Sequence, residues 1–303
     1  MTHKRILIIS SAEKEEAISY NDTFVKALNE GVGEDVAIEW HNYHDFVIRI
    51  DTDSLDIQLV ETGESLSVFD FVYFKSFFRY HDQAVTIATY LKHIDKPFVS
   101  SELLTYVPLT KLSQLVRLAL GSLPIAKTIY MSTDKYVEHY DDIVAELGTP
   151  FIFKATDGAG GRDNYLIRSR DQLIDAVAEG QPNHFITQEF IENDSDLRVI
   201  VLGREPQMVI KRTRSGDTHL NNTSQGADAS LLDVAELSDY DREISLKAAA
   251  LMGRETAGVD LMYELGTGKP YILEVNASPQ IGTGAFTDEK IAMYCKYFEN
   301  VVK

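Results

Sequence analysis

The segment Gly258–Pro279, GVDLMYELGTGKPYILEVNASP, restricts the possible folds of this chain more than any other stretch. Two runs rich in branched and aromatic residues, 259–265 and 270–276, enclose the tripeptide Gly-Thr-Gly. Glycines accept the positive φ angles of a tight turn, and such runs on both sides of a short glycine loop are typical of a β-hairpin. We therefore expect an antiparallel strand pair in this part of the chain.

Three oxygen-bearing side chains are expected on one face of this hairpin. A turn centred on Thr267 places Asp260 opposite Glu274, and Asn276 shares the face of Glu274 because side chains alternate along a strand. Two carboxylates and an amide, without thiol or imidazole, favour Mg²⁺, with Mn²⁺ as an alternative. An ordinary polar-faced hairpin stays open as another interpretation, and a β-bulge beside the loop would turn Asp260 away.

The composition is that of a soluble globular protein, since 44% of the 303 residues are hydrophobic and 25% are charged. Acidic residues outnumber basic ones by 47 to 29, which disfavours binding to nucleic acid or to an anionic membrane. The first apolar run is too short for a signal peptide or a membrane helix, so we expect a cytoplasmic protein. The single cysteine, Cys295, excludes an internal disulfide and a cysteine metal cage.

Residues 1–107 alternate between strand-like and helix-like patterns with short connections. This alternation is typical of a small α/β domain around a mainly parallel sheet. The first strand is followed by SSAEKEE rather than by a G-x-G-x-x-G sequence, which argues against dinucleotide binding. The expected strands are 5–10, 36–40, 56–60, 68–76 and 97–101, and the expected helices include 22–29 and 82–93.

Two lysines are placed where they could meet phosphate groups. Thr110 can cap a helix that begins at Lys111, and Lys154 lies in a strand that runs directly into a glycine-rich loop containing Gly160 and Gly161. Backbone N–H groups of such a loop approach phosphate oxygens closely, and a lysine adds a point charge. The loop lacks the G-K-[ST] ending of a Walker sequence, and a plain hairpin loop is an equally good interpretation.

The segment that follows could complete a nucleotide site. The end of the strand 184–191 can offer backbone groups to a base, and Asp196 can accept a ribose hydroxyl. A cluster of basic residues comes next, formed by Lys211, Arg212 and Arg214. The polar loop 216–230 after this cluster fits a segment that closes over a ligand.

Taken together and in this order, these features resemble the ATP-grasp superfamily. The stretches DLRVIVLG, LNNTSQGADAS and GVDLM…ILEVNASP are similar to those of RimK-like amino-acid and peptide ligases, and the resemblance covers roughly Leu104 to Pro279. It implies an α/β (α+β) ATP-grasp fold with an N-terminal Rossmann-like pre-ATP-grasp domain. The implied domains are 1–107, the central ATP-grasp subdomain 108–186 with its glycine-rich loop, and the C-terminal subdomain 187–303 with the metal site.

The resemblance also implies a role for each site residue. The phosphates of ATP would contact four residues, Lys111, Lys154, Gly160 and Gly161. The rest of the nucleotide would contact Glu189, Phe190 and Ile191 at the adenine and Asp196 at the ribose. Two Mg²⁺ ions would be held by Asp260, Glu274 and Asn276, with Glu274 bridging them. The catalytic residues would be Arg212, which would meet the transferring phosphoryl group, and Lys154, while Asn222 would lie beside that group.

The implied reaction is ATP-dependent formation of an amide from a carboxylate and an amine through an acyl phosphate. A carboxylate is a poor electrophile until phosphorylation gives it a leaving group, and cations suffice to stabilise the transfer. Three alternatives remain: a macrocyclase for ribosomal peptides, a small-molecule kinase, and a module that holds ATP without chemistry. The partners implied are ATP, an amino acid or peptide substrate, and a second copy of the chain in a homo-oligomer, with neither nucleic acid nor membrane.

Overall fold

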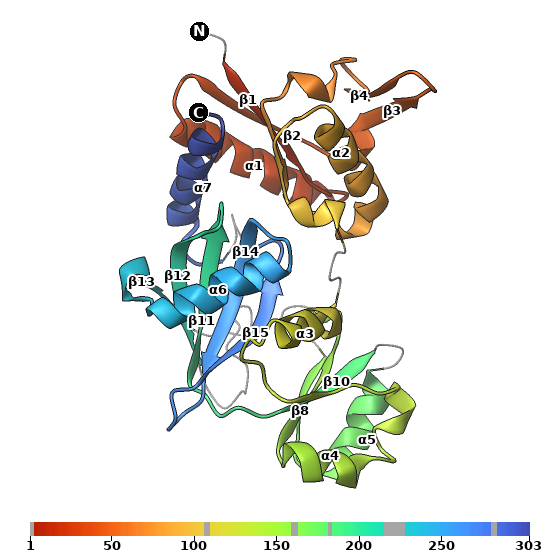
Figure 1. The fold of residues 1–303 in the computed structure, drawn as a ribbon, viewed down its shortest axis with the longest axis vertical. Coiled ribbons are helices and arrows are strands. Elements are labelled where there is room, and N and C mark those ends of the chain that lie inside the picture. Colours follow the sequence, from red (N-terminus) through yellow and green to blue (C-terminus); the bar gives the residue numbers. More distant parts are fainter. Residues whose placement is uncertain (1–2, 106–109, 159–162, 181–183, 215–227, 280–283) are drawn as a thin grey trace.

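The computed structural model describes residues 3–105, 110–158, 163–180, 184–214, 228–279 and 284–303. These residues form four sheets and the helices that cover them, arranged as an upper, a middle and a lower part in Figure 1. Within these ranges, no helix combines the length and the apolar character that a membrane crossing requires. The α/β fold class expected from the sequence is confirmed.

The upper part is built around a parallel sheet. Its strands lie in the order β2 (Val36–His41), β1 (Lys4–Ile9), β5 (Phe71–Phe74) and β6 (Phe98–Val99). Helices α1 (Glu15–Gly31) and α2 (His81–His93) pack into two separate apolar clusters that include alternate residues of β1 and β5, so they cover opposite faces. The expected strand at 56–60 forms, but it pairs in a separate antiparallel hairpin, β3 (Phe46–Ile50) with β4 (Leu55–Leu59).

The lower part is a four-stranded antiparallel sheet. Its order is β7 (Thr128–Ile129), β10 (Phe185–Glu189), β8 (Phe151–Ala155) and β9 (Asn164–Ile167). Alternate residues of β8, namely Phe151, Phe153 and Ala155, pack with helices α4 (Tyr140–Leu147) and α5 (Arg170–Glu179). Because side chains alternate along a strand, Lys154 is directed to the face that these helices leave uncovered.

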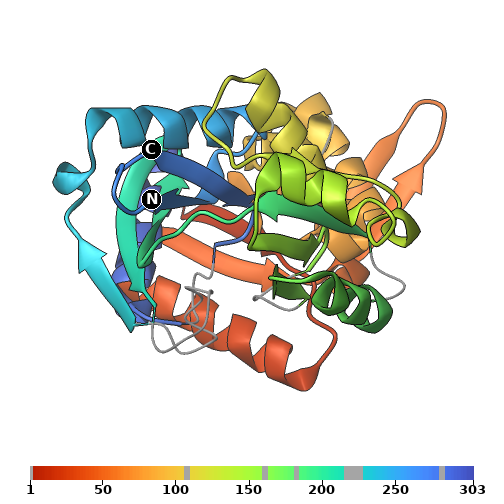
Figure 2. The same ribbon diagram turned by 90° about the horizontal axis from the view of Figure 1, so that it is seen from below.

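The middle part is a five-stranded antiparallel sheet. Its order is β13 (Asp228–Leu232), β12 (Glu205–Thr213), β11 (Ser195–Leu202), β14 (Thr256–Tyr263) and β15 (Pro270–Asn276). Helices α6 (Asp239–Leu251) and α3 (Lys111–Leu120) lie against the sheet, and residues of both helices share an apolar cluster with β11, β14 and β15. Figure 2 shows the same arrangement from below, with α6 running along one side of the sheet.

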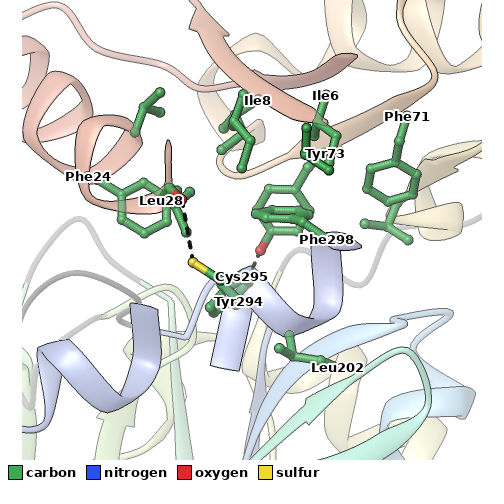
Figure 3. Close-up of a cluster of buried hydrophobic side chains, with 14 of the residues drawn as sticks. Ile6, Ile8, Phe24, Leu28, Phe71, Tyr73, Leu202, Tyr294, Cys295 and Phe298 are labelled. Atoms are coloured by element: carbon green, nitrogen blue, oxygen red, sulfur yellow. Dashed lines mark hydrogen bonds between the residues drawn. The ribbon is translucent and has the colours of Figure 1, made fainter. Parts of the chain in front are cut away.

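Helix α7 (Thr287–Val301) connects the upper and middle parts. Its buried residues Tyr294, Cys295 and Phe298 share one cluster with residues of β1, β5 and α1 and with Ile200, Leu202 and Ile210 of the middle sheet. Figure 3 shows the three α7 residues between those of the upper sheet and Leu202. The Tyr294 and Tyr73 hydroxyls are 3.4 Å apart. The C-terminal helix therefore stabilises the contact between two sheets that belong to distant parts of the sequence.

The domain boundaries expected at 107/108 and 186/187 stay a prediction. The apolar clusters cross these boundaries, because Leu118 of α3 packs with the middle sheet and Tyr294 of α7 packs with the upper one. A buried ion pair crosses the first boundary as well, between Glu102 after β6 and Arg254 before β14.

Candidate functional site

The hairpin of β14 and β15 forms with the register expected from the sequence. Asp260 lies opposite Glu274, and Gly258 lies opposite Asn276. A β-bulge follows Asp260, because Leu261 pairs with Ile272 and not with Leu273. The bulge that we considered beside the loop would have turned Asp260 away, but the bulge lies further along β15, where its additional residue brings the two acids opposite each other.

Asp260 is the centre of an ion-pair network across three neighbouring strands. Arg198 of β11 donates from Nε and Nη2 to the two carboxylate oxygens of Asp260, both at 2.8 Å. Arg212 of β12 lies 3.1 Å from Asp260 through Nη2, and 2.5 Å from Asp196 through Nε. The register explains these contacts, because Arg198 is opposite Asp260 and Asp196 is opposite Arg212.

Burial and the arginines act in opposite directions on the two acids. Burial tends to raise the pKa of Asp260, but Arg198 and Arg212 outweigh it and hold this pKa well below its usual range. The pKa of Asp196 is raised, because burial outweighs the attraction of Arg212 and Asp260 adds repulsion. Asp260 is therefore fully ionised at neutral pH, as a metal ligand must be.

Lys111 and Lys154 approach the site from two different elements. Thr110 caps α3 as expected, and the Lys111 backbone N–H donates to the Thr156 carbonyl oxygen at 2.8 Å while its ammonium group donates to the Gly158 carbonyl oxygen. The Lys154 ammonium group donates to Gln188 Oε1 at 2.9 Å. Burial first, and then repulsion by Lys111, lower the pKa of Lys154 to about 8, while attraction by Glu274 opposes them.

In the segment 189–191, which we expected at the adenine, several polar groups already form hydrogen bonds within the protein. The Glu189 backbone N–H donates to the Lys127 carbonyl oxygen at 3.0 Å, and the Glu189 carboxylate accepts from the Lys127 N–H at 2.8 Å. The Ile191 carbonyl oxygen accepts from Asn193 Nδ2 at 2.9 Å. Phe190 is half-buried between them, and the adenine role of the segment stays a prediction.

The remaining predicted site residues are Asp196 and three residues of the loops. Asp196 is only 3% exposed and binds Arg212, so it offers little surface to a ribose, and that role also stays a prediction. Gly160, Gly161 and Asn222 lie outside the described residues.

An apolar patch beside the site was missed from the sequence. It joins the lower and middle sheets and consists of Ala126, Ile191, Met262, Tyr271 and the partly buried Leu273. The signal that could have found it is the alternation along β14, since Met262 is two residues from Asp260 and so shares its face. Its four buried members are only 2–7% exposed, so the cluster packs the two sheets together and, like Asp196, offers little surface to a ligand.

The side chains of Asp260, Glu274 and Asn276 fit a hard divalent cation. All three carry oxygen, Asp260 is ionised, and the cross-strand register brings them to one face. Both Asp260 oxygens are paired with guanidinium groups, so a cation at this position would have to share them with Arg198 and Arg212. In the described part of the chain, no group of three or more histidine, cysteine, aspartate and glutamate side chains is arranged around one point.

The fold is that of the ATP-grasp enzymes. The solved structure of the ATP-grasp ligase PsnB with a precursor variant, Mg and ADP superposes with a TM-score of 0.71, covers 100% of both chains and is 16% identical. D-alanyl-alanine synthetase A from Vibrio cholerae O1 biovar eltor has a TM-score of 0.69 and 14% identity, over 100% of this chain and 98% of the other. At these identities the likeness concerns the fold alone.

The sequence shows which family of ATP-grasp proteins the chain belongs to. The profile of the RimK-like ATP-grasp domain matches residues 112–298, so the chain belongs to the RimK-like ATP-grasp family, as its motifs suggested. A "Probable alpha-L-glutamate ligase" of Klebsiella pneumoniae (strain 342) is 33% identical over 144 residues, 46% of each chain. A "Ribosomal protein bS6--L-glutamate ligase" of Escherichia coli O1:K1 / APEC is 32% identical over 153 residues, 47% of this chain and 49% of the relative. The chain thus spans about half the length of the curated relatives it matches.

Proposed function

We propose that this protein is an ATP-dependent ligase that joins a carboxylate to an amine on an amino acid or peptide. The observation that carries the proposal is the placement of Lys154, Lys111 and Glu274: Lys154 lies on the face of β8 that the helices leave uncovered, the Lys111 N–H donates to the carbonyl oxygen of Thr156 just after β8, and Glu274 lies opposite Asp260. These three residues come from β8, α3 and β15, and therefore from both sheets of the ATP-grasp fold. A Mg²⁺–triphosphate complex requires cations for its phosphates and carboxylates for its metal ion, and these residues supply both.

In this proposal the residues act mainly through charge and position. ATP would transfer its terminal phosphoryl group to the carboxylate substrate, leaving ADP, and the amine would then displace phosphate from the acyl phosphate. Lys111 and Lys154 would hold the phosphates, and Arg212 would stabilise the phosphoryl group as it moves. Asp196 would keep Arg212 in place through their 2.5 Å contact.

The cofactors in this proposal are ATP and two Mg²⁺ or Mn²⁺ ions at Asp260, Glu274 and Asn276. The ions would supply positive charge to the phosphate oxygens during transfer. Arg198 would share Asp260 with them and would keep its carboxylate oriented towards Glu274. The expected cytoplasmic location and the expected homo-oligomer belong to the same proposal.

The names of the two relatives point to glutamate as one substrate. Both are named as L-glutamate ligases, and each matches about half of its own length. We therefore place an acidic amino acid, or a peptide carrying one, first among the substrates to be tried.

The experiment is a trapping assay with hydroxylamine. Wild-type protein with ATP and Mg²⁺ is given individual amino acids and dipeptides, and both ADP and hydroxamate are measured. A ligase forms hydroxamate with the correct acid, because hydroxylamine intercepts the acyl phosphate. A phosphorylated product that hydroxylamine does not attack would instead identify a kinase.

The matched variants are Glu274→Ala and Glu243→Ala. Glu274 belongs to the predicted metal site, whereas Glu243 is exposed on α6. Glu274→Ala should lose ADP and hydroxamate formation with an unchanged unfolding temperature, and Glu243→Ala should behave as the wild type. Full activity of Glu274→Ala would exclude the proposed metal site.

A further inference from the structure

A chain of hydrogen bonds crosses the lower sheet on the face that α4 and α5 leave uncovered. Lys154 Nζ of β8 donates to Gln188 Oε1 of β10 at 2.9 Å, and Gln188 Nε2 donates to Thr128 Oγ1 of β7 at 2.8 Å. The Thr128 hydroxyl donates in turn to the Ala126 carbonyl oxygen at 2.9 Å. Two side chains thus connect the Lys154 ammonium group to the backbone at the joint between the lower and middle sheets.

The strand register explains how these side chains meet. Gln188 lies directly opposite Thr128 in the pair of β10 with β7. Lys154 lies opposite Ile186, which is two residues from Gln188 and therefore on the same face of β10. Long side chains reach such diagonal neighbours across a strand pair. Three adjacent strands therefore bring the lysine, the amide and the hydroxyl into one line.

The direction of each bond in this chain follows from the chemistry of its groups. An ammonium group only donates, so the amide oxygen of Gln188 must face Lys154 and the amide nitrogen must face Thr128. The Thr128 hydroxyl accepts from that nitrogen and gives its single proton to Ala126. Gln188 is 5% exposed, which leaves its side chain little room for another arrangement. The acceptor that Lys154 meets is therefore held in one orientation.

A fixed neutral acceptor suits a lysine that has to bind phosphate. The lysine ammonium group is a point charge on a flexible stem, and ordering this stem during ligand binding costs affinity. Gln188 orients the ammonium group of Lys154 before any ligand arrives. Because an amide carries no charge, it leaves the positive charge of the lysine available to a phosphate.

The same bond opposes a competing contact. Burial and then repulsion by Lys111 lower the pKa of Lys154, whereas Glu274 acts to raise it, so Glu274 and Lys154 attract each other. Glu274 belongs to the predicted metal site, and a lysine that moved onto its carboxylate would compete with the cation. The bond to Gln188 keeps the ammonium group on the lower sheet.

We propose that Gln188, oriented by Thr128, is a positioning residue that holds the Lys154 ammonium group ready for the phosphates of ATP and apart from Glu274. This inference rests on the proposed ligase function and adds two residues to its nucleotide site. Gln188 acts through Lys154 in this account and does not itself meet the reacting atoms.

The test compares ATP with adenosine as ligands of the full-length protein. ATP binding is measured by isothermal titration calorimetry at several Mg²⁺ concentrations, and adenosine binding by ligand-observed NMR. Gln188→Leu removes the acceptor at similar volume and should weaken ATP binding about 10- to 100-fold, as expected for a hydrogen bond of a charged group. It should also raise the Mg²⁺ concentration for half-maximal ATP binding and leave adenosine binding unchanged. A merely structural role would weaken both ligands.

The matched variants change the same residue types inside and outside the chain of bonds. Thr128→Val removes the hydroxyl and should weaken ATP binding in the same selective way, whereas Thr128→Ser should keep most of the affinity. Gln83→Leu and Thr89→Val make the same changes at exposed positions of α2 and should bind both ligands as the wild type does. Circular dichroism checks the fold, and the two Thr128 variants carry the test if Gln188→Leu does not fold.

Two outcomes would overturn the inference while the ligase proposal survives. One is wild-type ATP affinity and wild-type Mg²⁺ dependence in both Gln188→Leu and Thr128→Val. The other is an equal loss of ATP and adenosine binding in Gln188→Leu, which would show that Gln188 does not act through the phosphates. A wild type that does not bind ATP with Mg²⁺ would instead refute the proposed function itself.

Discussion

The ion pair between Glu102 and Arg254 should be essential for stability. Glu102 is 0% exposed and Arg254 is 2% exposed, and Arg254 Nε donates to Glu102 Oε2 at 2.9 Å. Arg254→Met keeps most of the side-chain volume but leaves a buried carboxylate without its partner. Breaking a buried pair from one side costs about 3–5 kcal/mol.

This cost corresponds to a measurable shift in the unfolding temperature. With an unfolding entropy of about 2.1 cal/mol/K per residue, a chain of 303 residues loses about 5–8 °C. The assay is thermal unfolding followed by circular dichroism. An unchanged unfolding temperature for Arg254→Met would refute the reasoning.

The double substitution Glu102→Leu with Arg254→Met is the control. Glu102 Oε1 and Arg254 Nη2 are buried, and neither has a hydrogen-bond partner among the described residues, so the pair is incompletely satisfied. Replacement of both charges by apolar groups should therefore cost far less than the single change. A double variant as unstable as the sum of two single variants would show that the pair acts through shape and not through charge.

The same pair should affect the metal site. Arg254 Nη1 donates to the Val275 carbonyl oxygen, and the Val275 N–H donates to Gln114 Oε1 at 3.0 Å. Val275 stands between Glu274 and Asn276, so both buried side chains fix the strand that carries the predicted metal ligands. Arg254→Met should raise the Mg²⁺ concentration required for ATP binding at temperatures well below its unfolding transition.

Three further changes should have defined effects. Lys154→Met should raise the unfolding temperature at pH 7, because the folded protein lowers the pKa of Lys154 to about 8 and so holds the charged lysine at a cost. This gain should shrink as the pH rises from about 8 towards 10.5, since the lysine then loses its charge first in the folded and finally in the unfolded protein. Phe298→Ala should cost about 3–5 kcal/mol in denaturant unfolding, since Phe298 is 0% exposed and packs between two sheets. Thr110→Ala should cost about 1 kcal/mol through the loss of the α3 cap, and should weaken ATP binding because Lys111 begins that helix.

The hairpin could be predicted from the sequence because its determinants are local. The alternation of residue types and the glycine loop predict the strand pair. The positions of Asp260 and Glu274 along it predict that both acids lie on one face. The bulge could not be predicted, since it depends on how β15 packs at the edge of the middle sheet, where the Ile272 N–H donates to the Pro124 carbonyl oxygen.

The ion pairs around Asp260 could not be predicted without the tertiary structure. Arg198 meets Asp260 only because β11 pairs with β14, although 62 residues separate the two side chains along the chain. Helix α7 packs between the upper and middle sheets, and the sequence of α7 alone gives no sign of this. Local patterns thus located the predicted metal ligands, whereas the residues around them follow from the order of the strands.

The most direct test of the account is the dependence of ATP binding on Mg²⁺. Isothermal titration calorimetry compares the wild type, Lys154→Met and Glu274→Ala, each with Mg²⁺ and with EDTA. The account predicts tight binding only for the wild type with Mg²⁺, and a marked loss of affinity in both variants. Equal binding with and without Mg²⁺, or wild-type affinity in both variants, would contradict a nucleotide site shared by the lower and middle sheets.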